Sequence, residues 1–377
     1  MSGPALPPEA WSAALCSLPA MGPARLLGFL RRWQPEEAWH RVTDGSWLHH
    51  REVVLAVGSD AARMAELWVA SADATDVAAV WQRHIDRGIG VFTMRSPSYP
   101  APLRDDIEPP GVLFACGDPD VIAGPRVAIV GTRDASQYGL DLAYELGRDL
   151  SVAGVAIVSG LAIGIDGAAH AGALAAETAP PIAVVGSGLD VVYPRKHRSL
   201  WREVERRGVV LSEAPLGAPP EKWRFPARNR VIAALADVVI VVESRELGGS
   251  MHTVAEAQRR DRPVFAAPGP VRSATSAGTN RLLRDGAQVL CDASDVLLAL
   301  GLSAALLRSV QEQRPEPSAD DAAVLDAAGW SPVSLDVLAA RTARPLGALA
   351  LALDRLRADG WLTERGGWYE RIARSDR

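Results

Sequence analysis

The chain has 377 residues, of which 48% are hydrophobic, and its 40 Lys and Arg against 45 Asp and Glu give a net charge of −5. This composition supports more than one domain and excludes a global basic field, so any nucleic-acid contact must come from a local patch. Three isolated cysteines indicate neither a zinc site nor a disulfide framework, and no signal peptide or membrane span is recognisable, so we expect a soluble, cytoplasmic protein.

Residues 1–84 have helical patterns throughout and are predicted to form one helical domain. The segment SLPAMGPARLLGFLRRW turns at Pro19, Gly22 and Pro23 and resembles a helix–hairpin–helix, whose turn N–H groups can meet a phosphate. A small helical packing domain is the alternative that we favour, because the motif is short. We interpret the tryptophans of this segment as core anchors rather than base-stacking platforms: Trp11, Trp33, Trp39, Trp47, Trp68 and Trp81.

Residues 85–125 form a connecting extension that we expect to pack on the edge of a sheet, with short strands in GIGVFTM and at 112–115. From 126 to 298, short apolar runs alternate with helical patterns, which predicts a doubly wound parallel α/β sheet. The predicted strands are 127–130, 155–158, 182–185, 209–211, 238–242, 264–266 and 288–290.

Almost every predicted strand ends in a turn of small residues. Such turns bring backbone N–H groups close to an anion, and in open α/β sheets ligands bind at the carboxyl ends of the strands. We therefore predict one extended binding edge, with a guanidinium in its first turn. The turns are Gly131-Thr132-Arg133, Ser159-Gly160, Gly186-Ser187-Gly188, Gly248-Gly249-Ser250 and Pro268-Gly269.

Several kinds of chemistry are disfavoured by missing motifs. Neither lysine, Lys196 or Lys222, lies in a Walker A context, and the chain lacks both a GxGxxG fingerprint and a GxSxG elbow. Asp166 and His170 have a spacing that metals use, but no third ligand is nearby, so we expect Asp166 to cap a helix that starts at Gly167. We predict no catalytic residue, no metal and no cofactor.

Two basic segments accompany the glycine-rich edge. Residues 195–207 carry six Lys and Arg, and residues 222–230 carry four, with Trp223 and Phe225 interleaved and no acidic residue. Cations that follow a backbone and rings that stack on bases are what single-strand binding requires. For 202–207 a solvated helix face is the interpretation that we accept, whereas 222–230 does not form a simple amphipathic face.

A polar linker is expected at 299–319. Residues 320–377 then show three helical patterns and a hairpin with Gly366-Gly367 at its tip, which together predict a winged helix. Its third helix is rich in Ala and Leu, with Arg355 and Arg357 late in it. This composition slightly favours a protein-contact or regulatory module over a DNA reader.

The motifs VGTR, VSGLAIGIDGAAH, VVGSGLDVVYPR, FPARNRVIA, GGSMHT and PGPVRSATSAGTNRLLRDGA, in this order, resemble the DNA-processing protein A (DprA/Smf) family. The resemblance implies a Rossmann-like core, binding of single-stranded DNA without sequence preference, loading of a RecA-type recombinase in natural transformation, and a homodimer. Ile163 stands where many members have a basic residue, and Gly248 replaces a usual serine.

The resemblance places the family's glycine-arginine motif at Gly131-Thr132-Arg133, its basic position at Arg195 or Lys196, and its FPxRNR motif at 225–230. Combined with the turns and basic segments, it completes the predicted DNA-binding set. This set is Gly131, Thr132, Arg133, Ser159, Gly160, Arg195, Lys196, Lys222, Phe225, Arg228, Asn229, Arg230, Gly249 and Ser250.

Two other functions remain as alternatives. The core also resembles nucleotide phosphoribohydrolases of the lysine-decarboxylase-like (LOG) group, because Thr253 and Glu256 keep a T-x-x-E spacing. The residues before them are GGSMH instead of PGGxG, which disfavours this activity. The second alternative is an interaction scaffold whose glycine-rich edge binds nothing.

Overall fold

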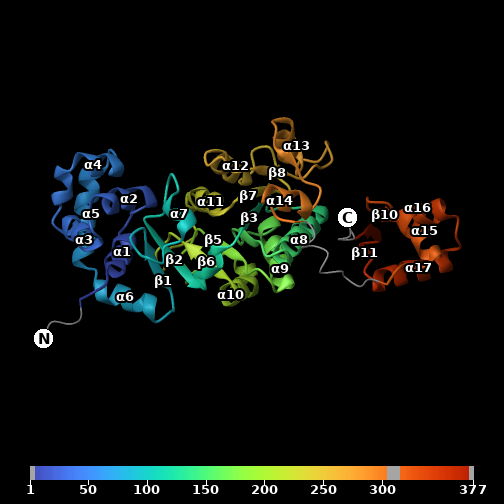
Figure 1. Ribbon diagram of the computed structural model, residues 1–377, viewed down its shortest axis with the longest axis horizontal. Helices are drawn as coiled ribbons and strands as arrows, with labels where there is room; N and C mark the ends of the chain where they lie inside the picture. The colour runs from blue at the N-terminus through green and yellow to red at the C-terminus, as the bar shows by residue number, and fades with distance from the viewer. Residues whose placement is uncertain (1–4, 304–314, 373–377) are drawn as a thin grey trace. The chain divides into compact units, whose positions relative to one another are not determined.

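The structure, a computed structural model, describes residues 5–303 and 315–372 (Figure 1). The chain divides into two compact units, Met1–Leu307 and Arg308–Arg377. Residues 304–314 of the predicted linker and 373–377 of the predicted winged helix lie outside the described residues. No helix of the described ranges is long and apolar enough to cross a membrane.

The first unit begins with a group of short helices. Proline occupies the first position of α1, α2 and α3, where its missing N–H costs no hydrogen bond. The predicted tryptophan anchors are confirmed, since Trp33, Trp39, Trp47 and Trp68 are buried and Trp11 and Trp81 pack against the same cluster. The helices are α1 (Pro8–Ser17), α2 (Pro23–Arg32), α3 (Pro35–Thr43), η1 (Ser46–His49), α4 (Arg51–Val57), α5 (Ala61–Asp73) and α6 (Val77–Ile85).

A nine-stranded sheet forms the centre of the first unit, in the order β1-β2-β6-β5-β4-β3-β7-β8-β9. The seven strands from β3 to β9 are parallel, and β1 and β2 add an antiparallel edge, which confirms the predicted α/β fold. The strands are β1 (Gly90–Thr93), β2 (Val112–Gly117), β3 (Arg126–Val130), β4 (Ala156–Ser159), β5 (Ile182–Val185), β6 (Val209–Ser212), β7 (Val238–Val241), β8 (Val264–Ala266) and β9 (Gln288–Val289).

Helices cover both faces of this sheet (Figure 1). In β3, Val127 and Ile129 pack in one apolar cluster while Ala128 and Val130 pack in another, as the alternation of side chains along a strand requires. The cluster of the N-terminal helices continues onto β2, β5 and β6. The helices of the sheet region are α7 (Ala101–Arg104), η2 (Pro119–Ala123), α8 (Gln137–Val152), α9 (Ile165–Ala176), η3 (Arg195–His197), α10 (Arg198–Arg207), α11 (Arg224–Leu235), α12 (Ser250–Gln258), α13 (Ala277–Arg284) and α14 (Ala293–Ala299).

The sheet order reverses between β3 and β7. The chain passes from β3 outward through β4, β5 and β6, then crosses back so that β7 pairs with β3 on its other side. Because the central strands are parallel, their carboxyl ends lie along one edge, which we call the rim. The turns after β3, β4, β5, β7 and β8 therefore all open on the rim, as the pattern of turns predicted.

The second unit has the helices and hairpin of the predicted winged helix. Three antiparallel strands pair in the order β10-β12-β11, with Leu349, Leu353 and Leu356 of α17 buried in its core. Its elements are α15 (Ala319–Ala328), β10 (Val333–Ser334), α16 (Leu335–Thr342), α17 (Leu346–Ala358), β11 (Leu362–Arg365) and β12 (Trp368–Arg371). The two arginines of α17 are ion-paired: Arg355 contacts Asp321 at 2.7 Å, and Arg357 contacts Asp354 at 3.5 Å.

Candidate nucleic-acid interface

A pocket opens on the rim above β3, β4 and β5. Residues from four separate segments line it, so it forms only when the sheet has assembled. The lining residues are Arg133, Gly160, Ala162, Ile163, Val185, Gly186, Ser187, Tyr193, Pro194, Phe225 and Arg228. The structure thus brings together four residues of the predicted DNA-binding set, Arg133, Gly160, Phe225 and Arg228, with two residues of the predicted turn after β5, Gly186 and Ser187.

One wall of the pocket combines a cation with two rings. The Arg133 guanidinium lies 5.1 Å from the centre of the Phe225 ring, and the Tyr193 and Phe225 rings are 5.7 Å apart. Arg133 is exposed and has no ion pair among the described residues. Its charge is therefore available to an anion, while the ring beneath it limits the orientations of the guanidinium.

Arg228 forms the floor of the pocket. It is only 7% exposed, and its Nη1 donates a hydrogen bond to the carbonyl of Val184, while its Nε has no partner in the described structure. A Cβ atom at Gly160 would lie 1.7 Å from Arg228 Nη1, so this turn accepts only glycine if the guanidinium is to remain there. The result is a buried positive charge under the rim, with an unsatisfied donor beside the pocket.

Asp166 lies beside Arg228 and holds the turn after β4. Its carboxylate accepts the N–H groups of Gly160 and Ala162. Burial raises the pKa of Asp166, and the charge of Arg228 opposes that shift. The predicted capping role was wrong: α9 begins at Ile165 with Gly164 as its cap, so Asp166 lies inside the helix and reaches back to the turn.

The surroundings of His170 also indicate a structural role. It is fully buried, its Nε2 lies 3.2 Å from the carbonyl oxygen of Ile182, and burial lowers its pKa to about 4. It is therefore neutral near pH 7. No group of three His, Cys, Asp or Glu residues suited to a metal occurs in the described ranges.

A second buried carboxylate, Glu243, follows β7 at the point where the sheet order reverses. Its side chain accepts hydrogen bonds from the Ser136 N–H at 2.8 Å, the Ser136 hydroxyl at 2.6 Å and the Thr275 hydroxyl at 3.3 Å. Its carbonyl accepts the Thr132 N–H at 2.8 Å. Glu243 therefore joins the turns after β3, β7 and β8, and it fixes the backbone that carries Arg133.

The remaining predicted residues differ in their access to the rim. Arg195, Lys196 and Lys222 are exposed. Asn229 donates to the Gly249 carbonyl at 3.3 Å, and the buried Ser250 donates to the Ser244 hydroxyl at 2.8 Å. The Ser159 hydroxyl donates to the Ile129 carbonyl at 2.6 Å. Asn229, Ser159 and Ser250 thus support the turns, while the three cations face solvent.

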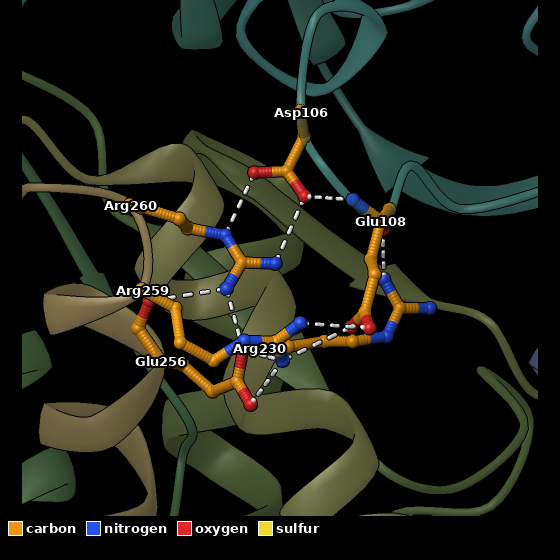
Figure 2. A network of polar contacts seen from close by, with 6 residues as sticks. All are labelled: Asp106, Glu108, Arg230, Glu256, Arg259 and Arg260. Atoms are coloured by element: carbon orange, nitrogen blue, oxygen red, sulfur yellow. Dashed lines mark hydrogen bonds and ion pairs between the residues drawn. The ribbon is translucent and has the colours of Figure 1, made fainter.

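Arg230 points away from the pocket, although Arg228 lies only two residues before it on α11. It pairs with Glu213, and both side chains are about nine-tenths buried, at 12% and 11% exposure. It also donates to the carbonyl of Glu108, next to a network of Asp106, Arg259 and Arg260 (Figure 2). We therefore assign Arg230 to anchoring α11 and not to a phosphate.

The same network holds Glu256, the acid of the hydrolase alternative. Its carboxylate pairs with Arg259 at 3.1 Å and with Arg260, whose side chain is 3% exposed (Figure 2). Glu256 does not line the rim pocket. A carboxylate held between two guanidinium groups away from the pocket is poorly placed to act on a bound nucleotide.

Tyr193 and Glu243 belong to the site but were not predicted. Tyr193 belongs to a Tyr-Pro pair that lines the pocket, and Glu243 comes shortly after the end of β7, a position that indicates a rim residue. Ile163, which departs from the family pattern, lines the pocket and is 41% exposed.

Residues 90–301 match the sequence profile described as DNA recombination-mediator protein A, and residues 309–367 match that of the DprA winged helix domain. The chain is 37% identical over 212 residues to DNA processing protein DprA of Bacillus subtilis, which covers 56% of this chain and 71% of the relative. It is 34% identical over 287 residues to Protein Smf of Escherichia coli, covering 74% of this chain and 76% of the relative.

Two solved structures of similar proteins extend the comparison. DNA processing protein A from Streptococcus pneumoniae superimposes with a TM-score of 0.65 at 30% identity, covering 78% of this chain and 98% of that one. DNA processing protein A from Helicobacter pylori, whose structure is described for its single-stranded DNA binding mode, superimposes with a TM-score of 0.51 at 32% identity, covering 56% of this chain and 95% of that one. The resemblance found in the sequence is confirmed: the chain belongs to the DNA recombination-mediator protein A (DprA/Smf) family.

Proposed function

We propose that the rim binds single-stranded DNA without sequence preference, with Arg133, Arg195, Lys196 and Lys222 at phosphates and Phe225 against a base. The observation that carries this proposal is the pocket itself, where a guanidinium without an ion pair among the described residues lies over the partly buried Phe225 ring, above the buried Arg228. Cations and stackable rings together suit a flexible polyanion whose bases are accessible. The binding mode named for the Helicobacter pylori relative supports the same ligand.

We further propose that the bound strand is protected and transferred to a RecA-type recombinase, as in natural transformation, and that the chain acts as a homodimer. Family membership supports this role, because the family is described as a recombination mediator. The test is the rate of recombinase filament formation on a single strand with and without the protein. An unchanged rate, with strand binding intact, would limit the protein to binding.

Hydrolysis of nucleotides is the alternative, and the ion pairs of Glu256 count against it. Incubation with nucleoside monophosphates is expected to release no free base. Base release that Glu256→Ala abolishes would support the alternative despite this geometry.

Replacing Phe225 tests whether its ring stacks on a base. Phe225→Leu is expected to weaken binding to an oligothymidylate by ~1–3 kcal/mol, the usual contribution of one stacked base. Phe225→Tyr keeps a ring and should bind nearly as the parent does. Fluorescence anisotropy at fixed salt measures both. Equal affinity of the Leu variant and the parent would place Phe225 in a purely structural role.

A further inference from the structure

Several cations of α10 and α11 form ion pairs with acids, but four that follow one another along η3 and α10 do not. Arg206 pairs with Glu203 at 2.5 Å, Arg207 lies 3.7 Å from Glu177, and Arg224 pairs with Glu221 at 3.1 Å. In contrast, four consecutive cations of η3 and α10 are exposed and have no ion pair within residues 5–303 and 315–372: Arg195, Lys196, Arg198 and Arg202.

The fold holds the first two of these cations at the mouth of the pocket. Tyr193 and Pro194, just before them, line the pocket. Just after them, His197 Nδ1 lies 3.0 Å from the carbonyl oxygen of Leu161, in the turn that follows β4. A segment anchored to the rim on both sides has little freedom to move away, so Arg195 and Lys196 stay beside the pocket.

The next two cations continue from that point along α10. Trp201 and Val204 are buried in the N-terminal cluster, which turns the opposite side of the helix to solvent. Arg198 and Arg202 lie on this outer side, four residues apart, and therefore about 6 Å apart along the helix axis.

The acids of α10 do not cancel this charge. Glu203 is paired with Arg206, and Glu205 turns toward β2, where it accepts the thiol hydrogen bond of Cys116 at 3.0 Å. The free positive charge therefore begins at the pocket and ends after Arg202, where the Glu203–Arg206 pair starts. The interpretation of 202–207 as a solvated face fits the exposed, ion-paired Arg206, whereas Arg202 is exposed without an ion pair among the described residues.

We propose that Arg198 and Arg202 form a phosphate track, along which a single strand of DNA continues from the rim pocket over the outer face of α10. This inference rests on the proposed function and extends it, because it sets the direction in which the strand leaves the pocket and adds two phosphate contacts. Short oligonucleotides fill the pocket only, and longer ones also reach the track.

The test compares an Arg198→Gln/Arg202→Gln variant with an Arg32→Gln/Arg206→Gln control, which removes the same charge from two ion-paired positions. Oligothymidylates of about 5 and about 20 nucleotides are titrated by anisotropy at several salt concentrations, lengths chosen around one binding site and several. All four substitutions are at exposed positions, and thermal unfolding checks that both variants fold.

For the long oligonucleotide, the track variant is expected to lose several-fold in affinity and to flatten the slope of log affinity against log salt by about 1.4, twice 0.7 per phosphate. The short oligonucleotide should bind the track variant as tightly as it binds the parent. The control variant should match the parent in affinity for both lengths.

A long-oligonucleotide slope in the track variant that equals the parent's would overturn the track while leaving the pocket intact. An equal loss of affinity in the control variant would also overturn the track, because it would show only a general electrostatic effect. An equal loss of affinity for the short oligonucleotide would overturn it as well. If the parent binds neither length, the proposed function fails as well.

Discussion

Arg133→Ala is expected to weaken binding of single strands by about 10- to 100-fold near 0.1 M salt, because it removes a hydrogen bond between charged groups of ~1.5–3 kcal/mol. Since Arg133 is exposed and contacts the Phe225 ring without an ion pair among the described residues, its loss should leave the unfolding temperature nearly unchanged. Anisotropy titrations and thermal unfolding of the same preparation measure both effects.

Arg133→Lys provides the matched control for this prediction. Lysine keeps the charge but loses the bidentate fork and the stacking on the ring, so the salt slope should persist while the affinity falls part of the way. If Arg133→Ala binds as tightly as the parent with the same slope, the wall of Arg133 and Phe225 is not where the strand lies.

Arg230→Ala is expected to act on stability instead, with a loss of about 3–5 kcal/mol in the free energy of unfolding, because it leaves a buried carboxylate without its partner. Glu213 is that carboxylate, and burial already raises its pKa, an effect that Arg230 opposes. Urea denaturation measures the loss, and the salt slope of the folded variant should match that of the parent.

The loss should also depend on pH. Without Arg230, the pKa of Glu213 in the folded state rises further above its value in the unfolded chain, so the folded state binds the extra proton. Stability of the variant then falls as pH increases from the unfolded pKa toward the folded one, and the deficit relative to the parent shrinks at lower pH. Glu213→Gln in the Arg230→Ala background removes the buried charge and should recover part of the stability.

An Arg230→Ala variant that unfolds like the parent but shows a flatter slope of log affinity against log salt would instead support the DNA contact predicted for Arg230 from the FPxRNR motif. The two arginines of this motif have different roles: Arg228 lines the pocket, and Arg230 pairs with Glu213.

The sheet was predictable because its central strands are short apolar runs buried on both faces, most of which end in a turn of small residues. The segment 127–130 illustrates this, as it corresponds to β3 within one residue. The shared rim followed from the parallel pairing that strand–helix–strand alternation implies. These features depend on local pattern, which the sequence displays directly.

Side-chain partners across the fold were not predictable in the same way. Asp166 was expected to cap its own helix, yet it accepts N–H groups from the turn before it. Arg230 is neutralised by Glu213, which lies 17 residues earlier, just after the end of β6. Whether a cation is free or paired depends on such contacts, so a basic segment alone could not separate Arg202 from Arg206.

The most direct test of the rim as a site for a flexible polyanion is a salt titration that compares a single strand, a duplex of equal length and a mononucleotide. With about four phosphates neutralised in the pocket and its mouth, log affinity for the single strand should fall with log salt at a slope of about −3, and the single strand should bind most tightly. Tight binding of the mononucleotide, or a single-strand affinity that does not change with salt, would contradict this function for the rim.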